Sequence, residues 1–181
     1  MIDQNILIRS VTEATVEVFS MMLDMKVEFQ GALTESKASE HGIVSLVGIT
    51  GEWSGSGGFS CSPALASVIC ARMLGGSLDS SRPVVDDEVL DVVAEVTNMM
   101  IGNVKNGLEA TTGPLAISVP TVIYGRNFRF RNMSGLPGAS LIFGTGDGRE
   151  DEKFEVRIAL GRVSGHSSAR LRICAPGVAR E

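Results

Sequence analysis

The stretch DDEVLDVVAEVTNMMIGNVK, residues 86–105, decides the fold. Its apolar residues recur at helical spacing, and the three acids at its start suit the positive N-terminal end of a helix dipole. The stretch therefore predicts a long helix over residues 86–108. Because most of the circumference of this helix is apolar, we expect it to lie against a sheet and to expose one narrow polar edge.

Five residues of this helix fall on one stripe when they are plotted at about 100° per residue. Two of the five are unfavourable inside a helix, the asparagine by about 0.5 kcal/mol and the glycine by about 1 kcal/mol relative to alanine. A glycine there would let another surface approach the backbone closely. Periodicity alone leaves two interpretations open, a solvated face and a functional edge. The stripe consists of Asp91, Glu95, Asn98, Gly102 and Lys105.

An exposed acid and an exposed amide one turn apart can perform only a limited set of reactions. The sequence shows no nucleophile with an adjacent base and no carboxylate pair of the kind that glycosidases use. The Asn98 amide, however, can accept one hydrogen bond and donate another, so it can hold a water molecule in a chosen orientation. That ability is useful where the electrophile is already activated elsewhere, as in phosphoryl transfer.

The whole chain, residues 1–181, is predicted to form a single domain with a mixture of helices and strands. Residues 75–83 are rich in Gly and Ser and indicate a linker. In residues 153–160 the apolar side chains alternate, which is typical of a strand with one buried face. Helices are predicted over 9–29 and 63–74, and strands over 43–49, 53–60, 115–123, 126–131, 139–144, 153–161 and 169–174.

The first predicted helix aligns with the long helix when it is shifted by 78 residues. Chance similarity between amphipathic helices is one explanation, but the shared spacing of acids and a shared Met pair favour an internal duplication. The half-repeats would cover about residues 1–80 and 81–175 and place two equivalent helices on one sheet. Ser20 cannot copy the donor and acceptor of an amide, so we expect one active helix per chain. The alignment pairs Glu13 with Asp91, Glu17 with Glu95, Ser20 with Asn98, and Asp24 with Gly102.

Composition and charge exclude several classes of function. The formal net charge of −5 argues against binding to nucleic acid or to anionic membranes, and the basic stretch 126–131 is interpreted as a strand. No run of 18 apolar residues and no signal peptide is seen, so a cytoplasmic protein without a membrane segment is expected. The three cysteines and two histidines have no metal-ligand spacing, and no metal site is predicted.

The spacing Asp91-x3-Glu95-x2-Asn98 resembles the signature of the CheX branch of the CheC/CheX/FliY family of chemotaxis phosphatases. A proline some two dozen positions after the asparagine belongs to that signature, and Pro120 fits it. The resemblance is strongest over residues 84–125 and weaker over the earlier glycine-rich strand and short helix. Its supporting motifs are Gly102-Asn103 and Ser118-Val-Pro-Thr-Val-Ile-x-Gly125.

The resemblance implies a three-layer, CheC-like α/β fold with an antiparallel-rich sheet, and a homodimer. It implies that the substrate is the aspartyl-phosphate of a CheY-like response regulator, which brings its own Mg²⁺, so that this chain binds no cofactor. Asn98 would orient the attacking water and Glu95 would pair with a lysine of the regulator. Asp91, Gly102 and Lys105 would contact the partner. The alternative is a non-catalytic binding module that docks a regulator or a flagellar switch component.

Overall fold

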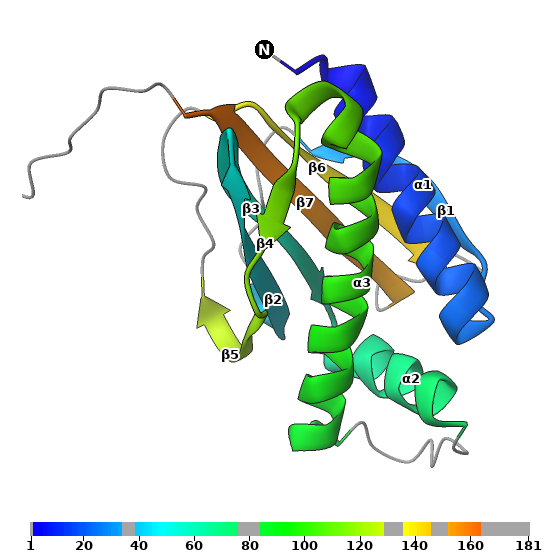
Figure 1. Ribbon diagram of the computed structural model, residues 1–181. Coiled ribbons are helices and arrows are strands. Elements are labelled where there is room, and N and C mark those ends of the chain that lie inside the picture. The colour runs from blue at the N-terminus through cyan, green and yellow to red at the C-terminus, as the bar shows by residue number, and fades with distance from the viewer. Residues whose placement is uncertain (1, 34–38, 76–83, 129–135, 146–151, 164–181) are drawn as a thin grey trace, which may run out of the picture.

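In the computed structural model, a seven-stranded antiparallel sheet carries two long helices side by side (Figure 1). The structure describes residues 2–33, 39–75, 84–128, 136–145 and 152–163. The antiparallel sheet that the sequence predicts is confirmed. In chain order the elements are α1 (Gln4–Leu23), β1 (Val27–Leu33), β2 (Ser39–Gly51), β3 (Trp53–Cys61), α2 (Pro63–Leu74), α3 (Asp87–Thr112), β4 (Leu115–Ile117), β5 (Thr121–Phe128), β6 (Gly138–Thr145) and β7 (Lys153–Arg162).

Strands from the two halves of the chain alternate across the sheet in the same way from either edge: one strand of one half, two of the other half, then two of the first. The order is β1-β6-β7-β3-β2-β4, and β5 pairs with the same outer edge of β2 as β4. Helix α1 contacts β1, β6 and β7, and α3 contacts β4, β5, β2 and β3. The two long helices therefore contact opposite halves of the sheet, which meet where β3 pairs with β7.

Both long helices cover the same face of the sheet. The ring of Phe19 in α1 stacks on Phe154 of β7 with 4.6 Å between centroids, and Ile101 in α3 lies directly over Gly57 of β3. Phe154 pairs with Cys61 of β3. Phe59 and Gly57 are two and four positions before Cys61 in the same strand, so all of these positions are on one face of the sheet. The described residues thus form two layers, and the predicted third layer is wrong for them.

Helix α3 confirms the predicted long helix and extends it by four residues. The carboxylate of Asp86 caps the helix by accepting a hydrogen bond from the Val89 N–H at 3.0 Å, and acids fill the first turn. The helix ends at Thr112, and Gly113 has a φ of 73°. The buried face includes Val89, Val92, Val93, Val96, Thr97, Met100, Ile101, Val104 and Leu108.

The predicted boundaries of the first helix, residues 9–29, are wrong at both ends. Asp3 caps α1 six residues before that range begins, and Asp24 closes the helix in the left-handed conformation with a φ of 49°. Val27 is already buried as the first residue of β1. The predicted helix was too long because apolar residues continue at helical spacing beyond Leu23. Met25 and Val27 are apolar because they pack at the turn and in β1, and they are not part of the helix.

Replacing Asp24 by glycine is expected to stabilise the protein. A left-handed conformation is strained for a residue with a Cβ and costs glycine nothing, and glycine is the preferred residue just past the end of a helix. Asp24→Gly should therefore raise the midpoint of thermal unfolding by about 1–4 °C, as expected for about 0.5–1 kcal/mol in a chain of this size. Asp24→Ala is the control and should lower the midpoint. A lower midpoint for the glycine variant would contradict this account.

Two predicted strands need correction near the site. The single strand predicted over 115–123 is two strands, β4 and β5, with a break at Ser118–Pro120. Pro120 has no N–H to donate to a ladder, and the Ser118 hydroxyl replaces a backbone acceptor there. The strand predicted over 126–131 reaches Phe128, and its remainder lies outside the described residues. The strand predicted over 169–174 and most of the predicted linker also lie outside them.

Candidate active site

The polar stripe predicted on the long helix forms one exposed edge of α3. Asp91 and Glu95 are exposed, while Asn98, Gly102 and Lys105 are half-buried. The five side-chain positions are brought together as predicted, since an α-helix of this length is regular throughout. Three of them point towards β4: the position where a Gly102 Cβ would lie is 3.9 Å from Ile117 Cδ1, and Asn98 and Lys105 lie on the same flank.

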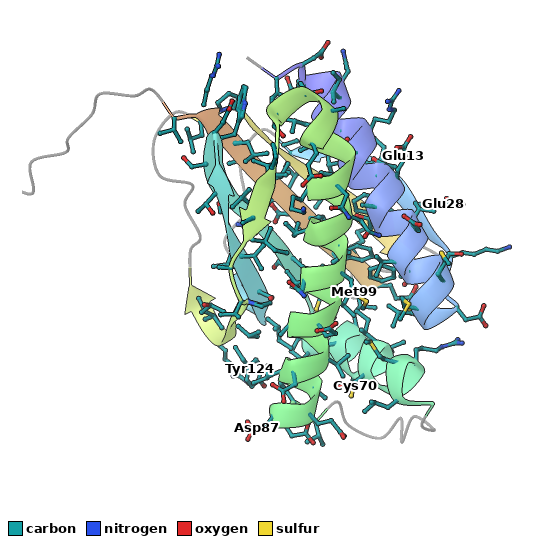
Figure 2. The ribbon with its side chains drawn as sticks, in the orientation of Figure 1. Glu13, Glu28, Cys70, Asp87, Met99 and Tyr124 are labelled. Carbon is teal, nitrogen blue, oxygen red and sulfur yellow. The ribbon has the colours of Figure 1, made fainter. Side chains whose placement is uncertain are left out.

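The opposite flank of α3 is occupied by α1. Asn103 Nδ2 donates to Glu17 Oε2 at 3.3 Å, and Gly107 lies beside Ser10. Figure 2 shows Met99 on this flank, between the two helices. The α1 side of α3 is therefore taken up by packing within the chain, and the stripe on the other side is the part of the helix that can meet a partner.

Glu95 and Asn98 have no side-chain partners among the described residues. In the part of the chain that the structure describes, neither the Glu95 carboxylate nor the Asn98 amide makes a side-chain hydrogen bond or an ion pair. Asn103, an asparagine on the same helix, does make one with α1. The acid and the amide, one helical turn apart, thus keep their full capacity to accept and donate hydrogen bonds for a molecule outside the chain.

Gly102 is not required by the packing of this chain. A Cβ added there would meet only Ile117 Cδ1, at the ordinary van der Waals distance of 3.9 Å. Gly57, by contrast, would place a Cβ 2.7 Å from the Ile101 side chain, so the sheet needs that glycine for α3 to lie on it. A glycine within a helix costs about 1 kcal/mol relative to alanine. The structure therefore gives no internal reason for Gly102, which fits a need for clearance on the outer side.

Lys105 is engaged by a neighbour on its own helix. Its Nζ lies 2.7 Å from Glu109 Oε1, and its side chain is 20% exposed. The hydrogen bond from Lys105 lowers the pKa of the Glu109 carboxyl against a weaker opposing effect of burial. The contact of Lys105 with a partner protein stays a prediction. To make it, the ammonium group must either break its ion pair with Glu109 or bind Glu109 and the partner at the same time.

The corner between β4 and β5 is fixed on β2 beside the α3 edge. The Ser118 N–H donates to the Gly48 carbonyl at 2.9 Å, and the Gly48 N–H donates to Ser118 Oγ at 2.9 Å. This anchoring presents Val119, which is 85% exposed, two residues beyond the Ile117 that lies under Gly102. Val119 was not among the residues predicted for the site. The signal was an apolar residue held between a serine and a proline at a strand break.

The described residues offer the means to orient a molecule, and their thiols do not offer a nucleophile. The two described thiols, Cys61 and Cys70, are buried, and burial raises the pKa of both, so neither is a ready thiolate near neutral pH. In the same ranges no three His, Cys, Asp or Glu side chains come close enough together to hold a metal ion. No helix in the described ranges is long and apolar enough to cross a membrane.

The fold is CheC-like: a mixed α/β fold in which an antiparallel sheet packs with three helices. Over residues 43–144, more than half of its length, the sequence matches the family described as "Chemotaxis phosphatase CheX". The chain belongs to the CheX family. The matched residues include the whole stripe from Asp91 to Lys105 and the β4–β5 corner.

Individual relatives agree with this assignment. The chain is 30% identical to the CheY-P phosphatase CheX of Thermotoga maritima over 92 residues, which are 51% of this chain and 57% of that protein, so it spans little more than half of this relative. The CheX structure from Vibrio vulnificus superposes with a TM-score of 0.73 at 20% identity, over 86% of this chain and 99% of that one. CheX in a CheX–CheY–BeF3–Mg²⁺ complex from Borrelia burgdorferi gives 0.68 at 25%, over 85% and 97%.

Proposed function

We propose that this chain hydrolyses the aspartyl-phosphate of a CheY-like response regulator in chemotaxis signalling. The observation that carries the proposal is the pair of the exposed Glu95 and the half-buried Asn98 on the outer edge of α3, both without side-chain partners in the described part of the chain. Membership of the CheX family supports the reaction class. The names of the Thermotoga relative and of the Borrelia complex support CheY as the kind of partner.

In the proposed mechanism the regulator supplies the electrophile and this chain supplies the geometry. The Asn98 amide accepts a hydrogen bond from water and holds it in line with phosphorus. The Glu95 carboxylate pairs with a lysine of the regulator and fixes the docked orientation. The Mg²⁺ belongs to the regulator, and this chain binds no cofactor. Asp91 orders Glu95 one turn away, and Gly102, Lys105 and Val119 complete the contact surface.

The docked surface can be mapped with a regulator loaded with beryllofluoride and Mg²⁺, which imitates the phosphorylated form. The expected result is that amide NMR shifts of this chain change along the outer edge of α3 and at the Ser118–Pro120 corner. They should change much less when beryllofluoride is left out. Changes confined to the face of the sheet opposite the helices would contradict the proposed site.

Substitution of Gly102 by alanine should stabilise the protein and impair its function. The methyl group fits beside Ile117, so the free energy of unfolding should rise by about 0.5–1 kcal/mol. The same methyl group would hold the regulator away from the helix and should lower kcat/KM by about tenfold, since small displacements of a reacting geometry are costly.

Gly107→Ala is the matched control for this prediction. Gly107 is on the same helix, and a Cβ there would also meet only an ordinary contact, 3.6 Å from Ser10 Oγ, but it faces α1. It should give a similar gain in stability with unchanged turnover. Equal turnover for Gly102→Ala and Gly107→Ala would show that the clearance at Gly102 is not used.

Three further features of the molecule are also proposed. The half-repeats, about residues 1–80 and 81–175 of one domain, arose by duplication. The order of the strands supports this, because strands of the two halves alternate in the same way from either edge of the sheet. The chain forms a homodimer, which its outer strand β5, with Ile123 and Tyr124 exposed on it, could support. It acts in the cytoplasm, where response regulators are phosphorylated.

A further inference from the structure

The two halves of the sheet can be aligned residue by residue. Residues 42–48 (GIVSLVG) in β2 resemble residues 138–144 (GASLIFG) in β6, 96 positions later. In the first half Val47 pairs with Gly57, and in the second half Phe143 pairs with Phe154. Since Val47 and Phe143 correspond, their partners Gly57 and Phe154 occupy equivalent places on the face that the helices cover.

The residues above these two places fix the alignment of the helices. Ile101 of α3 lies over Gly57, and Phe19 of α1 stacks on Phe154. Phe19 therefore corresponds to Ile101, 82 residues later, and not to the residue 78 positions later. A second feature has the same offset: the hydroxyls of Thr15 and Thr97, both fully buried, donate to the carbonyls four residues earlier at 2.7 Å.

This alignment differs from the predicted one by four residues, about one helical turn, and changes the counterpart of every residue in the stripe. Gly102 no longer corresponds to Asp24, which ends α1 and so could not match a position in mid-helix. The counterparts are Arg9 for Asp91, Glu13 for Glu95, Val16 for Asn98, and Ser20 for Gly102.

We propose that the outer edge of α1 is a second regulator-docking site that is silent because Val16 replaces the amide. The proposal rests on the proposed function of the α3 edge. Val16 is 39% exposed and presents only methyl groups, so it cannot orient water. Glu13 keeps the position of Glu95, with its side chain 71% exposed. Arg9 lies 3.6 Å from Glu13, so a cation stands where α3 has Asp91 and competes for the carboxylate that a regulator lysine would need.

The test places new side chains on α1 in an Asn98→Ala background, where the native site is inactive. One variant carries Val16→Asn alone, and a second carries Arg9→Asp with Val16→Asn. Each should regain turnover of phosphorylated regulator by about tenfold or more over the background, and the second should gain more. Val16→Thr is the matched control, because threonine has the shape of valine and a hydroxyl but no amide. Ser20→Asn tests the alignment by 78 residues. Neither control should regain activity.

The outcomes separate this inference from the function on which it rests. If the wild-type chain does not accelerate the loss of the phosphoryl group from the regulator, the proposed function itself is wrong; if it does and Asn98→Ala is equally fast, the water-orienting role of Asn98 is wrong. If they differ, and both Val16→Asn variants melt like the background without any gain, the silent site on α1 does not exist. A gain with Ser20→Asn instead of Val16→Asn would overturn the alignment by 82 residues. A gain with Val16→Thr would show that the amide is not the missing group.

Discussion

Asn98→Ala is expected to lower turnover of phosphorylated regulator by about 100-fold or more and to leave regulator binding nearly unchanged. An interaction that orients the attacking water acts mainly in the transition state, so its loss appears in kcat and hardly in the dissociation constant. The amide is half-buried at the edge of α3 and has no hydrogen bond within the described residues, so its removal breaks no interaction of the fold. The measurements are the rate of phosphate release and the affinity for the beryllofluoride-loaded regulator.

Asn103→Ala is the matched control for this result. It removes an identical amide five residues further along the same helix, but that amide is bound to Glu17 of α1 on the opposite flank. Its turnover should stay near that of wild type, with a small loss of stability from the exposed hydrogen bond. Turnover at the wild-type rate in Asn98→Ala would eliminate the water-orienting role.

Substitutions of Glu95 should have the second largest effect and should change both steps of the reaction. Glu95→Ala is expected to weaken docking and to lower kcat/KM by about tenfold to 100-fold, since a charge-assisted pair with the regulator would be lost. Glu95→Gln keeps the shape and loses the charge, so it should be impaired as well. The affinity of the wild type should fall with added salt more steeply than that of the glutamine variant.

Glu88→Gln provides the comparison for Glu95. Glu88 is an exposed acid in the first turn of the same helix, about two turns before Glu95. Its neutralisation changes the net charge by the same amount and should leave turnover unaltered. If Glu95→Gln matches wild type at low salt, the role of an ion pair with the regulator has to be abandoned.

The long helix and its polar edge could be predicted because their signal is local. Amphipathic spacing, an acidic start and a capping aspartate all lie within residues 86–105, and the structure agrees with each of them. The end of α1 could not be predicted in the same way. Met25 and Val27 are apolar because they pack at a turn and in a strand, and their spacing from the helix is accidental.

The alignment of the two halves shows where sequence reasoning reaches its limit. Amphipathic helices superpose almost equally well when they are shifted by one turn, so the sequence favoured pairing Ser20 with Asn98. Only contacts with the sheet, Phe19 on Phe154 and Ile101 on Gly57, distinguish the two alignments. Side-chain contacts between distant strands are invisible in a one-dimensional pattern. Val119 was missed for another reason: one continuous strand was predicted across the break at Ser118–Pro120.

The central claim is tested most directly by the decay of a phosphorylated CheY-like regulator in the presence of Mg²⁺ and a small molar fraction of this chain. Hydrolysis predicts that the whole pool of regulator loses its phosphoryl group faster than by its own decay, with many turnovers for each chain. A module that only binds would alter at most one regulator per docking site and leave the rest to decay unaided. Decay at the intrinsic rate, under conditions where binding is demonstrated, would contradict the account.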